Sequence, residues 1–239
     1  MVFKKDRFEN VSAVIFDLDG LMVYSKELSL KSWRQFLAGY GSWMEEEEYH
    51  QLIGIDSRLS TDYVVKKTGL QTAPEEILKR RREMMLALVD EKLPVADGLF
   101  SLINRLSDHH YPMAVASNNF KEYVERVLHV IRLRQFFKCV ITIDDVANSM
   151  PSPDVYLAAS KCLGVHISLC LALEDSPAGM QAALKAGMTC VVIAHRNLQS
   201  VDFSEAHACF DSLSDFLIFF NQYISSQAKS HFTRGQIHN

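Results

Sequence analysis

Two pairs of acidic residues are the positions in this sequence where chemistry is most readily placed. Asp17 and Asp19 flank one leucine at the end of the run VSAVIFDLDG, and Glu174 and Asp175 follow the apolar residues 169–173. Clustered carboxylates repel one another unless a cation lies among them. A hard divalent cation such as Mg²⁺ accepts carboxylate oxygens together with phosphate oxygens and water. The acids therefore indicate a magnesium site, although DLDG taken alone is at least as typical of a solvated turn.

A third polar group, Ser117-Asn118-Asn119, stands between an apolar run at residues 111–116 and a helical pattern that continues to Val130. Small hydroxyl and amide side chains at the start of a helix are suited to a phosphoryl group, because backbone N–H groups and the helix dipole favour an anion there. The same residues alone would also make a good helix N-cap. The combination with the two acidic pairs favours a phosphate site.

The elements that must position these groups are strands of a parallel sheet. Short apolar runs alternate with helical patterns from Asp97-Gly98 onward, as expected for a sheet covered on both faces. In such a sheet, ligands bind outside the carboxyl ends of the strands. Gly20 allows the chain to turn away directly after the first acidic pair. The expected strands cover residues 11–16, 111–116, 139–143, 169–173, 189–194 and 208–210.

The segment at residues 25–93 contains no convincing strand. Its apolar residues have helical spacing, and turn signals occur at residues 39–42, 54–56 and 69–74, which predicts an all-helical insert. The charge runs at residues 45–48 and 79–82 are typical of solvated helix faces. Arg58, just after the second turn, is a candidate phosphate-binding cation on an inner loop of the insert, and an ordinary surface arginine is the alternative.

Composition limits the classes of protein that this chain can belong to. Its 239 residues are 48% hydrophobic and carry a formal net charge of −4 with a pI near 6.1, which gives no general attraction for nucleic acid or anionic membranes. The amino terminus lacks the apolar core of a signal peptide, and no apolar run is long enough to span a bilayer, so we expect a cytoplasmic protein. Without a CxxC pair, buried reduced thiols are expected at the cysteines, which are Cys139, Cys162, Cys170, Cys190 and Cys209.

In combination, FDLDG, the strand end at Ser117, PSPDVYLAA and LEDSPAGMQAALKAGM resemble the four motifs of the haloacid dehalogenase superfamily, in the branch of β-phosphoglucomutase and related phosphatases. The resemblance covers residues 11–211. It implies an α/β fold with a Rossmann-like parallel sheet core and an inserted all-helical cap. The implied boundaries are a core at residues 1–24 and 94–224, a cap at 25–93 and a disordered tail at 225–239.

The resemblance also implies roles for individual residues. Asp17 is similar to the family's nucleophile, which forms an aspartyl phosphate, and Asp19 to its general acid and base. The implied metal ligands are Asp17, Glu174, Asp175 and the backbone carbonyl of Asp19, which would hold Mg²⁺. The implied phosphate- or substrate-binding residues are Gly20, Ser117, Asn118, Asn119 and Arg58.

Three positions depart from the family pattern. Met150 stands where the motif Lys-Pro-x-Pro-Asp has its lysine, so the site lacks one positive charge. Tyr24 replaces a frequent aspartate, and Ser29 stands where the mutases have a histidine, which argues against a mutase. Lys121 is a candidate compensating cation, with a solvated helix-face lysine as the alternative.

These features predict a phosphoric monoester hydrolase that uses Mg²⁺ and acts on a small phosphorylated metabolite, either a sugar phosphate or a nucleotide, with turnover weakened by Met150. The alternatives are a catalytically impaired relative that binds a phosphometabolite or a protein partner, and a phosphoglucomutase-type isomerase. Neither nucleic acid nor a membrane is an expected partner.

Overall fold

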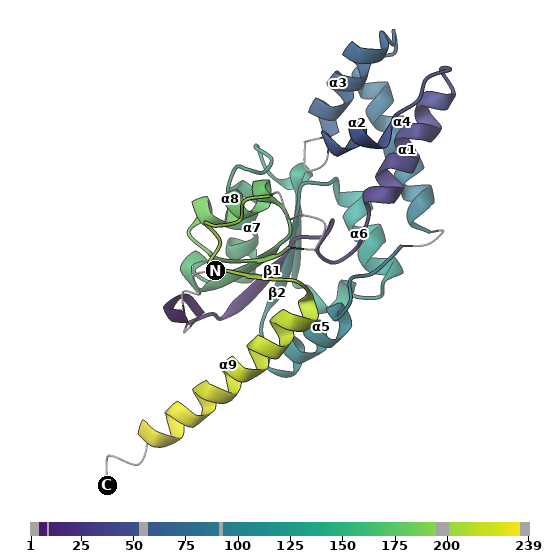
Figure 1. Cartoon of the computed structure of the whole chain (residues 1–239). Helices are drawn as coiled ribbons and strands as arrows, with labels where there is room; N and C mark the ends of the chain where they lie inside the picture. Colours follow the sequence, from purple (N-terminus) through teal and green to yellow (C-terminus); the bar gives the residue numbers. More distant parts are fainter. Residues whose placement is uncertain (1–4, 9, 53–56, 91–92, 195–200, 235–239) are drawn as a thin grey trace.

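The structure, a computed structural model, describes residues 5–8, 10–52, 57–90, 93–194 and 201–234. A parallel sheet with helices on both faces forms the body of the molecule, and a separate group of helices stands beyond it (Figure 1). The strands are β1 (Ala13–Phe16), β2 (Met113–Ser117), β3 (Cys139–Thr142), β4 (Cys170–Glu174), β5 (Thr189–Ile193) and β6 (Ala208–Phe210). The helices are α1 (Lys26–Ala38), α2 (Glu46–His50), α3 (Ser57–Thr68), α4 (Pro74–Val89), α5 (Leu99–Asp108), α6 (Lys121–Val130), α7 (Asp154–Leu163), α8 (Pro177–Ala186) and α9 (Leu213–Arg234).

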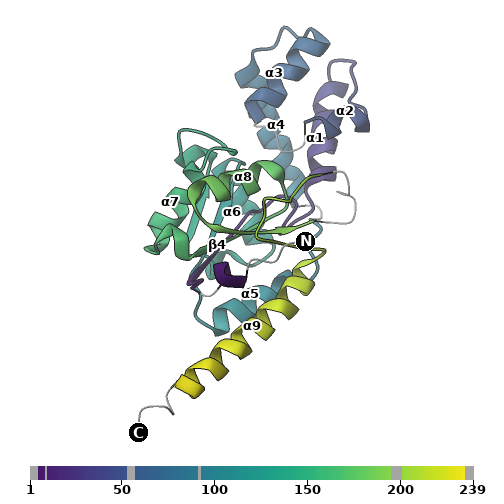
Figure 2. The same cartoon turned by 60° about the vertical axis from the view of Figure 1, so that its left-hand side comes forward.

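Strand β1 lies inside the sheet, whose order is β3-β2-β1-β4-β5-β6 with every pair parallel. All four of its side chains are buried, and they alternate between two cores. Val14 and Phe16 pack in the core under α5, α6 and α9, whereas Ala13 and Ile15 pack in the core under α7 and α8 (Figure 2). This double coverage explains the unbroken apolar run in the sequence.

Helices α1 to α4 form the helical cap. They pack around their own apolar core, which includes Trp33, Phe36, Tyr49 and Ile77, and the carboxyl-terminal end of α4 also packs in the core under α5, α6 and α9. The α/β class and the helical cap predicted from the sequence are thus confirmed, whereas the turn expected at residues 54–56 lies outside the described residues.

The expectation of five reduced cysteines is wrong for one pair. Cys139 on β3 and Cys162 on α7 form a disulfide, with their Cα atoms 6.4 Å apart. Helix α7 packs against β3 and brings together two cysteines 23 residues apart in sequence, a pairing that a search for CxxC spacing does not detect. Cys170 and Cys190 are buried free thiols, and Cys209 is a half-buried one.

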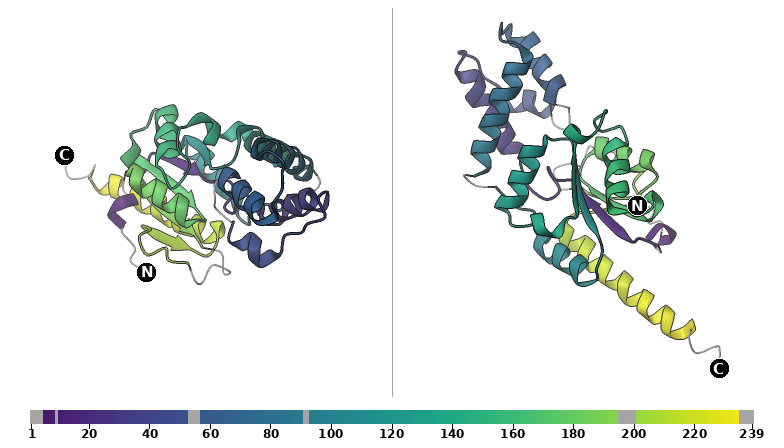
Figure 3. Two further views of the ribbon diagram at one scale, coloured as in Figure 1. Left: turned by 90° about the horizontal axis from the view of Figure 1, so that it is seen from above. Right: turned by 180° about the vertical axis from the view of Figure 1, so that it is seen from behind.

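The carboxyl-terminal segment also differs from the expectation of a tail from Ser225. Helix α9 continues to Arg234, because neither glycine nor proline interrupts residues 213–234. The helix extends from the core on the side opposite the cap (Figure 3). Among the described residues, no helix combines the length and apolar character needed to cross a bilayer.

Candidate active site

The ends of β1 and β4 bring three acidic side chains together. Phe16 pairs with Leu173 in the sheet register, and the backbone N–H of Asp17 donates to the carbonyl of Leu173 at 3.0 Å. Asp17 therefore lies beside Glu174 and Asp175. One carboxylate oxygen from each of the three residues lies within 4.8 Å of the others, and all three residues are buried.

Burial and mutual repulsion disfavour the charged forms of these three acids. The pKa of Asp17 is raised well above its usual value, first by burial and then by the charges of Glu174, Asp175 and Asp19. Burial raises the pKa of Glu174 to about 7, and burial together with the charge of Glu174 raises the pKa of Asp175 to about 8. Such a set of oxygen ligands suits a hard divalent cation, whose positive charge would offset the repulsion between the carboxylates.

Two glycines make room for the acids. Gly20 has a φ of +95°, and a Cβ built there would lie 1.9 Å from Oδ2 of Asp175. A Cβ on Gly179, in the first turn of α8, would lie 1.8 Å from Oε1 of Glu174. No side chain fits at either position unless the neighbouring carboxylate moves.

Asp19 is held by hydrogen bonds from three side chains that are distant from one another in sequence or lie on different segments. Its Oδ1 accepts from Ser25 Oγ at 2.5 Å, just before α1, and from the Tyr123 hydroxyl at 2.8 Å, on α6. Its Oδ2 accepts from Asn119 Nδ2 at 3.2 Å. Burial raises the pKa of Asp19, and these three donors partly offset that effect. A carboxyl group with a raised pKa and a fixed orientation is suited to proton transfer.

Glu174 is likewise fixed by donors. The hydroxyl of Tyr156, a fully buried residue of α7, donates to Oε1 at 2.5 Å, and the Ser176 hydroxyl donates to Oε2 at 3.2 Å. These contacts fix the orientation of the Glu174 carboxylate beside Asp17 and Asp175.

The last residue of β2 and the two residues after it line the same cavity. The hydroxyl of Ser117, almost fully buried, accepts from the backbone N–H of Asn119 at 3.1 Å. Asn118 bonds to the backbone of Met150, accepting from its N–H at 2.7 Å and donating to its carbonyl at 3.4 Å. The Met150 side chain is buried against the core under α7 and α8, where the family pattern has a charged lysine.

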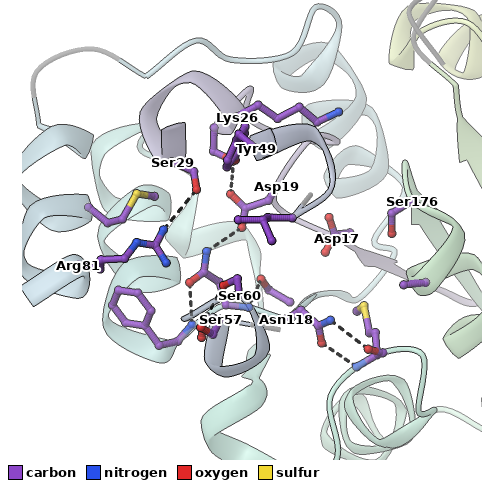
Figure 4. A pocket seen from close by; sticks show the side chains of 18 of the residues that line it. Asp17, Asp19, Lys26, Ser29, Tyr49, Ser57, Ser60, Arg81, Asn118 and Ser176 are labelled. Carbon is purple, nitrogen blue, oxygen red and sulfur yellow. Dashed lines mark hydrogen bonds between the residues drawn. The ribbon is translucent and has the colours of Figure 1, made fainter. Parts of the chain in front are cut away.

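A cavity of about 410 Å³ lies between the core and the cap, and Figure 4 shows its lining. From the core it is lined by Asp17, Asp19, Ser117, Asn118, Asn119, Met150, Asp175, Ser176 and Phe120, among others. From the cap and its first helix come Lys26, Ser29, Trp33, Tyr49, Ser57, Ser60, Arg81 and Arg82. The strand ends and the cap therefore enclose one shared space.

Two cationic residues that the sequence suggested for the site, Arg58 as a phosphate ligand and Lys121 as a compensating cation, are not among the described residues that line the cavity. Arg58 is exposed and is not among the described residues that line the cavity, because α3 turns Ser57 and Ser60 toward it instead. The ammonium of Lys121 donates to Asp145 at 2.9 Å and to the carbonyl of Val140, and Lys121 is not among the described residues that line the cavity.

Sequence reasoning missed three side chains at the site. Tyr123 and Tyr156 donate to acids that are distant in sequence, and no local pattern distinguishes them from core tyrosines. Arg81 was hidden in the charge run at residues 79–82, where a buried position could have been found only from the apolar spacing of α4.

The fold and the acid cluster together define an α/β protein whose acidic site lies between a parallel sheet and a helical cap. Residues 14–193 match the family described as "Haloacid dehalogenase-like hydrolase". This match spans most of the chain. The chain therefore belongs to the haloacid dehalogenase-like hydrolases, in the branch of phosphatases related to β-phosphoglucomutase and CbbY.

Individual relatives agree with this placement. The fructose-1-phosphate phosphatase YqaB of Escherichia coli is 29% identical over 188 residues, which cover 77% of this chain and 97% of that protein. The crystal structure of CbbY from Rhodobacter sphaeroides in complex with phosphate has a TM-score of 0.76 at 26% identity, covering 85% of this chain and 95% of CbbY. β-Phosphoglucomutase from Clostridium difficile shares the fold, with a TM-score of 0.76 at 21% identity over 90% of this chain and 99% of its own.

Proposed function

We propose that this protein is a Mg²⁺-dependent phosphatase of a small phosphorylated metabolite, with Asp17 as the nucleophile and Asp19 as the general acid and base. One observation carries the proposal: both aspartates, Ser117 and Asp175 line one cavity, with Glu174 beside them. The proposed core comprises residues 1–24 and 94–224, and the proposed cap comprises residues 25–93.

The donor set fits a magnesium ion. One oxygen from each of three buried carboxylates with raised pKa values lies within 4.8 Å of the others, and we propose that they hold Mg²⁺ together with the backbone carbonyl of Asp19. When bound, the cation offsets the negative charge of the nucleophile and of the phosphoryl oxygens.

Two half-reactions use the same pair of aspartates. A carboxylate oxygen of Asp17 attacks phosphorus in line, the phosphorus–ester oxygen bond breaks, and Asp19 gives its proton to the departing alkoxide. Asp19 then removes a proton from water, whose oxygen attacks the aspartyl phosphate and releases inorganic phosphate from Asp17. The hydroxyl of Ser117 binds the phosphoryl group, and the cap excludes bulk water and selects the leaving group.

Reductive trapping tests the nucleophile directly. Borohydride reduces an aspartyl phosphate to homoserine, so protein quenched during turnover of a sugar-phosphate panel should contain homoserine at position 17 by peptide mass spectrometry. Asp17→Asn should show neither homoserine nor turnover, while the exposed Asp202→Asn should behave as the parent. Homoserine at position 19, or turnover by Asp17→Asn, would refute the assignment.

We further propose that Met150 slows this reaction. Hydrogen bonds to Asn118 fix the backbone of Met150, which lines the cavity, so the site itself lacks the positive charge of the family's lysine. The ammonium of Lys121 bonds to Asp145 instead. The same observation favours the second candidate function, a relative that binds a phosphorylated metabolite without turning it over. Retention of phosphate binding with no phosphate release from any substrate would select that alternative.

A further inference from the structure

Lys26, the first residue of α1, is a half-buried cation in the wall of the cavity. The residue before it, Ser25, donates its hydroxyl to Asp19 at 2.5 Å, so the start of α1 is fixed to an acid of the site. The dipole of a helix opposes a positive charge at its N-terminus, so the stability of α1 does not explain a lysine at this position. The surroundings of the Lys26 ammonium offer a different explanation.

The charge of Lys26 acts on the acids at the ends of β1 and β4. The pKa of Asp175 is raised by burial and by the charge of Glu174, and Lys26 partly offsets that rise. Among the described residues, the ammonium forms no ion pair or hydrogen bond, so it attracts Asp175 without direct contact and can bind another anion. In Figure 4, the Lys26 side chain lies above Asp19, and its ammonium end lies above Asp17 in this view.

Two other cations are among the described residues that line the cavity, and both have different partners. A guanidinium nitrogen of Arg82 lies 3.9 Å from a carboxylate oxygen of Asp144. The guanidinium carbon of Arg81 lies 3.7 Å from the centre of the Trp33 ring. Of these three described cations, Lys26 is the one that lowers the pKa of an acid at the proposed metal site.

We propose that Lys26 is a further catalytic residue, whose ammonium binds the phosphoryl group during its transfer to Asp17 and so replaces part of the positive charge that position 150 lacks. This inference rests on the proposed phosphatase function and adds a residue to the same site. Three N–H donors on a flexible four-carbon stem allow the ammonium to follow phosphoryl oxygens as they move. Because Lys26 is only half-buried, water screens its charge, so the replacement is partial and Met150→Lys still increases the rate.

The test is a double-mutant cycle that combines Lys26→Met with Met150→Lys, measured as steady-state phosphate release from a panel of sugar phosphates. In the parent, Lys26→Met should lower kcat roughly 10- to 100-fold. In the Met150→Lys background, the same change should lower kcat by less than about threefold, because the second cation then carries most of the charge. Lys26→Arg should keep most of the kcat of the parent. The matched control is Lys31→Met, an exposed position on the same helix, which should behave as the parent.

The two backgrounds separate compensation from a structural role. A lysine that only stabilises the start of α1 would cause the same loss of kcat in both backgrounds, and that result would overturn the inference. An unchanged kcat in Lys26→Met would overturn it too. A loss confined to the parent background, with the Tm of Lys26→Met close to that of the parent, would support it.

Calorimetric binding of inorganic phosphate in the presence of Mg²⁺ distinguishes failure of this inference from failure of the proposed function. Lys26→Met should weaken phosphate binding roughly tenfold relative to the parent, and by less in the Met150→Lys background. If the parent releases no phosphate from any sugar phosphate, the phosphatase proposal fails, but this pattern of binding would still support the role of Lys26. Equal phosphate affinity in the parent and in Lys26→Met would refute that role.

Discussion

Raising the pH of the metal-free protein should destabilise it through the acid cluster. Asp175 has a pKa near 8 in the folded protein against a usual value of 3.8, and Glu174 has a pKa near 7 against 4.5. A carboxyl group whose pKa is raised by folding binds its proton more tightly in the folded state. Its contribution is fully present below pH 4 and is lost as the pH rises to about 8.

The largest of these shifts sets the size of the effect. For Asp175 the difference of 8 minus 3.8 is about four pH units, and at about 1.4 kcal/mol per unit the upper limit is about 6 kcal/mol. The pKa shifts of Asp17, Glu174 and Asp175 are not added, because the same mutual repulsion contributes to each of them. At roughly 2–4 °C per kcal/mol, the expected loss in Tm between pH 5 and pH 8 is on the order of 10 °C.

The assay is thermal unfolding in EDTA from pH 5 to pH 8, repeated with Mg²⁺. Asp175→Asn removes one buried charge, so at pH 8 without metal this variant should be more stable than the parent, while the two should be similar at pH 5. Mg²⁺ should restore the stability of the parent at pH 8 and have little effect on the variant. The exposed Asp202→Asn should follow the parent at every pH.

The test depends on whether Asp175→Asn is more or less stable than the parent at pH 8 without metal. If Asp175→Asn is less stable than the parent without metal, burial and repulsion do not govern the cluster. An equal Mg²⁺ response in the two proteins would show that the ion binds elsewhere.

Four further outcomes are expected. Met150→Lys should raise kcat by at least about tenfold in steady-state phosphate release. The reason is that removal of one preorganised donor from such a site commonly slows a reaction by roughly 10²- to 10³-fold. An unchanged kcat would contradict the proposed effect of Met150. Lys121→Ala should leave kcat unchanged in the same assay, since its ammonium bonds to Asp145; a loss of activity would reinstate it as a compensating cation. With Ser29 at the mutase position, the protein should release phosphate from glucose 1-phosphate faster than it forms glucose 6-phosphate, as measured by coupled assays of both products. Tyr156→Phe should weaken Mg²⁺ binding by roughly 10-fold in calorimetric titration, because it removes the donor that orients Glu174; unchanged affinity would limit Tyr156 to packing.

Local patterns in the sequence were sufficient to predict the parallel sheet and the polar residues at the ends of its strands. A buried parallel strand is an unbroken apolar run, and its carboxyl end follows directly in the sequence, so Asp17, Ser117 and Glu174 could be placed at one edge before the structure was known. The structure places these side chains near one another, and the roles assigned to them stay predictions.

Contacts between distant residues were not accessible in this way. Tyr123 lies 104 residues from Asp19, Tyr156 lies 18 from Glu174, and the cysteines of the disulfide are 23 apart. The position of Arg58 outside the cavity lining could not be predicted for a different reason. Successive helix residues are rotated by about 100°, so the sequence could place a cation at the start of α3 but could not tell which side of that helix faces the cavity.

The close packing of Gly20 against Asp175 and of Gly179 against Glu174 makes this enzyme vulnerable to very small changes. A single methyl group at either position is incompatible with the present location of a carboxylate oxygen. A one-step mutation to alanine could therefore inactivate the protein while every charged residue remains in the sequence. Inactive natural variants of this chain could thus retain all four acids, and they would have to be recognised from the glycines.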